Sequence, residues 1–216
     1  MHNYLQRLNN PLWKLLPQKL YRNRRRKEIT SLFNEWKSNG ASIPPPHFVK
    51  QHVISHFQQL YGCETLIETG TFKGQMVSAQ IVFFDKIISI ELSPELHQKA
   101  KNKFSDNPNV DILQGDSGIV LHEIMSNLDK QCLFWLDGHY SGGNTAKGTK
   151  ECPIYEELEA ILSSDLEHII LIDDARLFIG ENDYPTINEL TAFISKFDCS
   201  YKLQQSNDII RLTPFS

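Results

Sequence analysis

The chain has 216 residues and a formal net charge of −4; 40% of its residues are hydrophobic and 22% are charged. This composition is typical of one soluble globular domain. No stretch approaches the roughly 18 consecutive apolar residues that a membrane span needs, which argues against an integral membrane protein. The four cysteines, Cys63, Cys132, Cys152 and Cys199, form no C-x-x-C pair. We therefore expect a cytoplasmic protein without a disulfide framework or a zinc site.

The positive charge is confined to the N-terminal segment. Residues 1–27 hold eight Lys or Arg and no acid, whereas the remaining 14 bases and 26 acids give −12. Leucines and Trp13 accompany these cations, as in interfacial helices near anionic lipid. Two interpretations are open: the segment packs on its own domain or on a partner subunit of a homo-oligomer, or it docks on the inner face of a membrane. Nucleic-acid binding is disfavoured because the other 189 residues are acidic.

The chain divides at one stiff stretch, Ser42-Ile43-Pro44-Pro45-Pro46, which is typical of a linker. We expect a basic extension at residues 1–43, with a helix over about 27–38, and a main domain at residues 44–216. In that domain the apolar pattern predicts strands at 65–68, 86–91, 110–113, 132–136 and 168–172, and helices at 46–61, 74–84, 94–104, 117–128, 151–163 and 186–197. A hairpin of strands 201–204 and 208–212, turning at 205–207, ends the chain.

Strands that alternate with helices indicate an α/β fold whose parallel sheet has helices on both faces. In such sheets the ligand lies beyond the carboxyl ends of the strands. The unusual polar and glycine residues follow the strands: residues 68–74 after the first, 91–93 after the second, 114–117 after the third, 137–143 after the fourth and 173–176 after the fifth. We therefore expect one functional site at this edge.

The first three strand ends favour a nucleoside cofactor without a pyrophosphate. Gly70 and Gly74 allow a sharp turn that brings the backbone close to a ligand. Glu68 can accept a hydrogen bond from an amine, Glu91 can bind ribose hydroxyls, and Asp116 and Ser117 can contact an adenine edge. The pattern E-x-G-x-x-x-G lacks the third glycine of G-x-G-x-x-G, which disfavours an NAD-dependent oxidoreductase.

Residues 64–212 resemble a class I S-adenosylmethionine-dependent methyltransferase. The segment Ile67-Glu68-Thr69-Gly70-Thr71-Phe72-Lys73-Gly74 is similar to the first motif of the metal-dependent O-methyltransferases of macrolide sugars and of the cephalosporin pathway. The resemblance implies a Rossmann-like, mostly parallel seven-stranded sheet of order 3-2-1-4-5-7-6. It also implies a cofactor site made by Glu68, Gly70, Thr71, Phe72, Gly74, Glu91, Leu92, Asp116, Ser117 and Asp137.

The same resemblance implies a magnesium site. Asp137 follows the fourth strand and Asp173-Asp174 follow the fifth, where those enzymes bind Mg²⁺, and carboxylates are ligands that Mg²⁺ prefers. The ion would lower the pKa of the attacking hydroxyl. The sequence departs from the family at His139, where the sugar enzymes have an acid. His139 is a candidate general base; it could equally contact the substrate or be structural. The acid pair could instead cap a helix or bind a substrate amine.

These observations predict an S-adenosylmethionine-dependent O-methyltransferase, Mg²⁺-assisted, that acts on a hydroxyl of a sugar, a glycan or a small metabolite. In this hypothesis Asp137 and His139 are the catalytic residues, and residues 140–150 form a loop over the substrate. Arg176 neutralises the acid pair or binds a substrate anion. The alternative is a non-catalytic protein with the same fold that acts as a scaffold at a membrane surface.

Overall fold

A computed structural model describes residues 3–8, 15–138, 152–197 and 201–215. Seven strands form one sheet in the order β3-β2-β1-β4-β5-β7-β6, which confirms the predicted fold. The strands are β1 (Thr65–Thr69), β2 (Lys86–Glu91), β3 (Val110–Gln114), β4 (Leu133–Leu136), β5 (Ile169–Ile172), β6 (Tyr201–Ser206) and β7 (Ile209–Pro214). Neighbours among β1 to β5 pair in parallel, whereas β7 is antiparallel to both β5 and β6.

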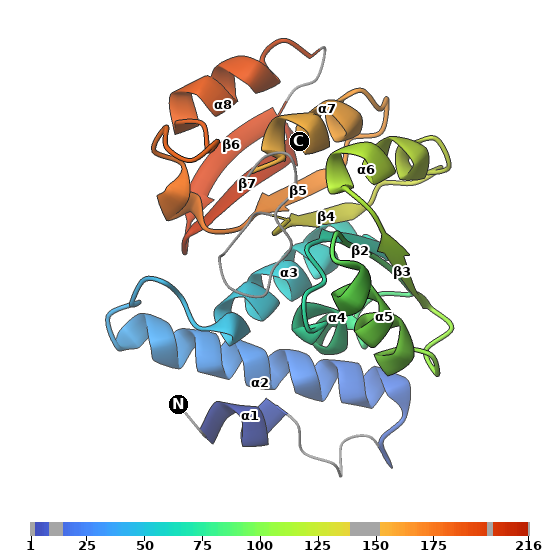
Figure 1. Ribbon diagram of the computed structural model, residues 1–216. Coiled ribbons are helices and arrows are strands. Elements are labelled where there is room, and N and C mark those ends of the chain that lie inside the picture. Colours follow the sequence, from blue (N-terminus) through green and yellow to red (C-terminus); the bar gives the residue numbers. More distant parts are fainter. Residues whose placement is uncertain (1–2, 9–14, 139–151, 198–200, 216) are drawn as a thin grey trace.

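The helices cover both faces of the sheet (Figure 1). They are α1 (Asn3–Leu8), α2 (Gln18–Ser38), α3 (His47–Tyr61), α4 (Gln75–Gln80), α5 (Pro94–Lys103), α6 (Ser117–Met125), α7 (Ile154–Leu162) and α8 (Ile187–Ile194). Residues of α3, α4 and α5 belong to one apolar cluster, and residues of α6, α7 and α8 belong to the other. The sheet therefore lies between two helical layers.

The strands supply both clusters because successive side chains point to opposite faces. Leu66 and Leu133 belong to the cluster with α3, whereas Ile67 and Phe134 belong to the cluster with α6 and α7. Every residue of β4 and β5 is buried. This explains their uninterrupted apolar sequences, since a central parallel strand is covered on both faces.

The N-terminal extension has a longer helix than the predicted 27–38. Helix α2 begins at Gln18, directly after the extended residue Pro17, and lies outside α3 and α4 as a further layer (Figure 1). Ile29, Leu32 and Trp36 are buried in the same cluster as the sheet residue Leu66. The extension therefore shares the core of the main domain.

Several basic residues of α2 bind other parts of the chain. Arg22 donates to the carbonyl of Val82 at 2.8 Å. The buried Arg25 donates to the carbonyl of Leu8, and Arg26 donates to that of Ser55. These contacts allow closely spaced cations to share one helix. Lys19, Arg24 and Lys27 remain exposed, so membrane contact through residues 1–27 stays a prediction.

The C-terminal hairpin turns at a different place from the predicted 205–207. Strand β6 continues to Ser206 and pairs with Ile209, so the turn consists of Asn207 and Asp208. Both have positive φ angles, 57° and 61°. Two consecutive left-handed residues match the twist of the flanking strands, and Asn and Asp tolerate that conformation.

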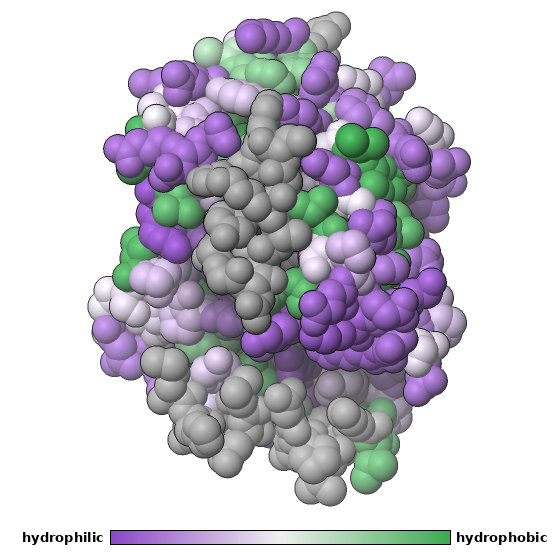
Figure 2. All heavy atoms as spheres, in the orientation of Figure 1, coloured by the Kyte–Doolittle hydropathy of each residue, from purple (hydrophilic) through white to green (hydrophobic). Residues whose placement is uncertain are grey.

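The visible surface is mostly hydrophilic, with apolar side chains in scattered groups (Figure 2). Among the helices that the structure describes, none has the length and apolar character of a membrane span. The three cysteines in the described ranges, Cys63, Cys132 and Cys152, are free and buried.

Candidate functional site

The turn after β1 is shaped by two glycines. Gly70 has φ +83°, and a Cβ atom there would lie 2.2 Å from the carbonyl oxygen of Asp137. Its N–H donates to the carbonyl of Ile90 at 2.9 Å. Gly74, with φ +62°, lies against the ring of Phe104 and directly precedes α4. Gly70 therefore brings the ends of β1 and β4 into contact, which a larger residue would prevent.

Glu68 is a buried acid at the end of β1, with 2% of its surface exposed. Ser89 on β2 donates a hydrogen bond to its carboxyl group, and the Ser89 and Thr71 hydroxyls lie 2.6 Å apart. Burial raises the pKa of Glu68 to about 8, and the carboxylates of Asp137 and Glu91 act in the same direction. Near neutral pH this acid is therefore mostly protonated, and a cationic ligand would favour its ionised form.

Glu91 at the end of β2 joins two turns. One carboxylate oxygen accepts the backbone N–H of Phe72 at 2.7 Å, and the other accepts that of Ser93 at 2.9 Å. Phe72 has φ +49° and is 38% exposed. Each oxygen has a further lone pair. The arrangement fixes the carboxylate and leaves it the capacity to accept ribose hydroxyls.

The predicted adenine contacts also have partners within the fold. Asp116 is the N-cap of α6 and accepts the N–H of Gly118 at 3.0 Å. The Ser117 hydroxyl donates to the buried carboxylate of Glu157 at 2.6 Å. Leu92 is partly exposed beside Glu91. Their cofactor roles stay predictions, and for Ser117 the observed contact is to α7.

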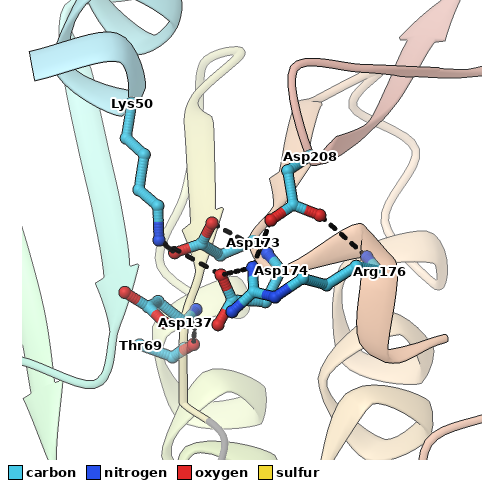
Figure 3. Close-up of polar contacts among 7 residues, drawn as sticks. All are labelled: Lys50, Thr69, Asp137, Asp173, Asp174, Arg176 and Asp208. Carbon is cyan, nitrogen blue, oxygen red and sulfur yellow. Dashed lines mark hydrogen bonds and ion pairs between the residues drawn. The ribbon is translucent and has the colours of Figure 1, made fainter. Parts of the chain in front are cut away.

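The acids after β4 and β5 gather around a lysine from α3. The ammonium group of Lys50 donates to Asp173, and to Asp174 at 3.2 Å. Asp137 lies below Lys50 in Figure 3, and its backbone N–H donates to the Thr69 hydroxyl at 3.2 Å. We call Lys50, Asp137, Asp173 and Asp174 the lysine–carboxylate cluster.

Electrostatics within this cluster oppose the effects of burial. Asp173 is fully buried, and burial raises its pKa well above the ordinary value despite the opposite effect of Lys50. Burial alone would lower the pKa of Lys50, but the carboxylates of Asp173, Asp137 and Asp174 together raise it. Lys50 therefore carries its charge at neutral pH.

Arg176 binds the other side of Asp174. Its guanidinium donates to Asp174 at 2.8 Å and also to Asp208 in the turn between β6 and β7. A second carboxylate oxygen of Asp208 accepts the backbone N–H of Arg176 at 2.8 Å. Asp174 itself has φ +52°, an unfavourable backbone conformation for a residue with a Cβ atom. Of the acid pair, Arg176 therefore neutralises Asp174, whereas the cation beside Asp173 is Lys50.

The fit of Mg²⁺ to these acids is poor. Mg²⁺ requires near-octahedral oxygen ligands at about 2.1 Å. One oxygen of Asp173 accepts the N–H of Asp174 at 2.8 Å, and the other accepts from Lys50. The Asp174 oxygen that faces Lys50 also accepts from Arg176. No group of three potential ligands among the described residues is arranged to hold a metal.

His139 and the predicted loop at residues 140–150 lie outside the described residues, so the assignment of His139 as a base stays a prediction. Sequence reasoning missed three residues that shape the site: Lys50, Ser89 and Asp208. Lys50 lies on a helix before β1, and Ser89 interrupts the apolar run of β2. That isolated polar residue was the available signal for Ser89, whereas nothing in the local pattern connects Lys50 to residues 123 positions away.

No protein-family model matches the sequence, and no curated protein sequence is a significant match. Solved structures do resemble the chain. The SAH-bound methyltransferase PaMTH1 of Podospora anserina has 16% identity over 87% of this chain and 88% of its own, with a TM-score of 0.54. The O-methyltransferase of Bacillus cereus in complex with SAH has 12% identity over 87% and 90% of the two chains, with a TM-score of 0.52.

A third structure, the O-methyltransferase TomG of Streptomyces achromogenes in complex with SAM, has 11% identity over 87% of this chain and 89% of its own, with a TM-score of 0.53. At such identities the likeness concerns the fold. It extends over most of each chain and agrees with the observed strand order. The chain therefore has the fold of the class I S-adenosylmethionine-dependent methyltransferases.

Proposed function

We propose that the chain is an S-adenosylmethionine-dependent methyltransferase that transfers a methyl group to a hydroxyl oxygen of a sugar, a glycan or another small molecule. The observation that carries the proposal is the hydrogen bond from the Phe72 backbone to the Glu91 carboxylate. It joins the glycine-containing turn after β1 to the acid at the end of β2. One rigid unit thereby presents both features that a nucleoside cofactor requires at this edge of the sheet.

Glu68 complements this unit. The cofactor carries an amino group, and a buried carboxyl group at the end of β1 gains an ionic partner when that group binds. The neighbouring Gly70 leaves no room for a side chain between β1 and β4. Two of the similar solved structures contain SAH and one contains SAM. These points support the same cofactor in this chain.

In the proposed reaction the acceptor oxygen attacks the methyl carbon in line with the sulfur. The new C–O bond forms as the C–S bond breaks, S-adenosylhomocysteine leaves, and the hydroxyl proton passes to a base. Asp137 is a candidate for that base because its backbone contacts the Gly70 turn, at the junction of the cofactor unit and the lysine–carboxylate cluster. His139 is the second candidate. Positioning of the two reactants supplies much of the rate enhancement.

Calorimetric titration with S-adenosylmethionine and S-adenosylhomocysteine tests the cofactor. We expect micromolar affinity for the wild type and a loss of at least about tenfold in Glu91→Ala, since the ribose would lose its acceptor. Glu64→Gln is the control, because Glu64 is an exposed acid just before β1 that forms an ion pair with Lys130 on the surface. A thermal unfolding curve for each variant establishes that it is folded.

The outcomes separate the two functional hypotheses. Binding that is weakened in Glu91→Ala and unchanged in Glu64→Gln supports the methyltransferase and leads to a screen of hydroxyl acceptors. A folded wild type that binds neither ligand contradicts the proposal and favours the scaffold. Truncation at residue 43 is an unsuitable test, because it would remove Ile29, Leu32 and Trp36 from the shared core.

A further inference from the structure

The lysine–carboxylate cluster already contains a cation. Lys50 points from α3 toward Asp173 and Asp174, which follow β5 (Figure 3), with 16% of its side chain exposed. Asp173 is fully buried and Asp174 is 13% exposed on the same measure. Both contacts therefore lie largely outside the reach of solvent, unlike the many surface ion pairs that contribute little. Removal of the lysine would leave Asp173 buried without its cationic partner.

The backbone holds Lys50 in this position. The preceding Val49 and the following Val53 and Ile54 are buried in the apolar cluster that α3 shares with the sheet. Gln51, also buried, lies 2.7 Å from the ring of His47 and accepts from Arg25 of α2. Helix α3 is thus fixed on the sheet side and on the α2 side. The lysine can reach the acids without a change in the helix.

An ammonium group and a divalent ion would compete for the same oxygens. On Asp173 a metal would have to approach an oxygen that already accepts from Lys50 or from the N–H of Asp174. On Asp174 the oxygen that faces Lys50 already accepts from both Lys50 and Arg176. Arg176 adds a second positive charge against Asp174. A divalent ion would therefore have to displace one cation and lie beside another, with like-charge repulsion in a partly buried site.

We propose that the ammonium group of Lys50 is the resident cation of this cluster and that the chain binds no divalent metal there. An ammonium group has three N–H donors, and two of them face Asp173 and Asp174. The third can donate to the acceptor oxygen, a role that rests on the proposed function. In this way Lys50 would hold the acceptor where metal-dependent O-methyltransferases use Mg²⁺.

Titration with Mn²⁺, followed through the electron paramagnetic resonance signal of the free ion, tests the proposal without any assay of activity. We expect no stoichiometric binding to the wild type. Lys50→Met frees the carboxylates and should bind one Mn²⁺ at least about tenfold more tightly than the wild type. Lys50→Met combined with Asp173→Asn should lose that site. Lys86→Met is the matched control, since Lys86 at the start of β2 forms an ion pair with Asp111 at the edge of the sheet opposite the strand ends that hold this cluster.

Thermal unfolding supplies a second readout. Mn²⁺ should raise the midpoint of Lys50→Met and leave those of the wild type and Lys86→Met unchanged, because an ion that binds only the native state stabilises it. If Lys50→Met does not fold, Lys50→Gln replaces it, since the amide keeps a donor for one carboxylate. Stoichiometric Mn²⁺ binding by the wild type, or a folded neutral variant that gains none, overturns the proposal. Neither result depends on whether S-adenosylmethionine binds, so this test and that of the proposed function fail separately.

Discussion

Replacement of Glu68 by glutamine should make the stability of the protein less dependent on pH. The side chain is buried at the end of β1, and its pKa in the folded protein is about 8 against an ordinary value of 4.5. Between these two values the unfolded chain has an ionised carboxylate while the folded chain holds the proton. Folding must therefore take up a proton, and the stability of the wild type falls as the pH rises through this window.

The size of this loss of stability follows from the difference between the pH and the ordinary pKa of a glutamate. At pH 7 the proton uptake by Glu68 costs about 3 kcal/mol relative to pH 4.5, at about 1.4 kcal/mol for each pH unit. Glutamine resembles the protonated acid in shape and cannot ionise. Its carbonyl can still accept the hydrogen bond of Ser89, whereas an amide donor without a partner would cost about 1–3 kcal/mol at every pH. The informative quantity is therefore the change with pH of the difference in unfolding free energy between Glu68→Gln and the wild type.

Urea unfolding of the cofactor-free wild type, Glu68→Gln and the surface control Glu64→Gln, measured from pH 5 to pH 8, provides the assay. We expect the stability of Glu68→Gln relative to the wild type to rise by about 3 kcal/mol over this range. The control should follow the wild type, because exposed ion pairs contribute at most about 1 kcal/mol. If the difference in unfolding free energy between Glu68→Gln and the wild type is the same at all pH values, the reasoning is refuted.

Three further predictions concern the turn, the core and the cofactor. Gly70→Ala should lower the free energy of unfolding by more than about 2 kcal/mol in thermal denaturation, because its Cβ would overlap the Asp137 carbonyl. In the control Gly62→Ala, where nothing lies within 4 Å of the added Cβ, the free energy of unfolding should fall by less. Equal decreases in the two variants would contradict the overlap. Ile29→Ala should destabilise the whole chain by about 2–5 kcal/mol in a single unfolding transition. The exposed Leu20 should tolerate alanine. A separate unfolding transition for the extension would mean that it folds independently. The affinity for S-adenosylmethionine should rise by up to about fiftyfold from pH 6 to pH 8, with proton release in calorimetry, because the pKa of Glu68 is about 8 and the ligand's amino group favours its ionised form. A pH-independent affinity would argue against that contact.

The sequence by itself determined the order and type of the elements in the main domain. Apolar strands such as 133–136 and the Gly, Pro and acidic residues between elements are local signals, and the alternation of strands and helices restricts the sheet to few topologies. The observed strand order confirms the one that the family resemblance implied. Glu68, Gly70 and Glu91 come together at the carboxyl edge because parallel strands place their ends there.

The tertiary structure decided the features that depend on contacts between distant residues. Helix α2 extends back to Gln18 because Arg25 and Arg26 find carbonyl partners on α1 and α3, whereas the local pattern shows only crowded positive charge. The pKa of Glu68 follows from burial, which a strand pattern does not quantify. The carboxylates after β4 and β5 suggest a metal when considered alone. Only the packing of α3 against the sheet reveals Lys50 among them, because electrostatic partners are selected by distance in space and not by separation along the chain.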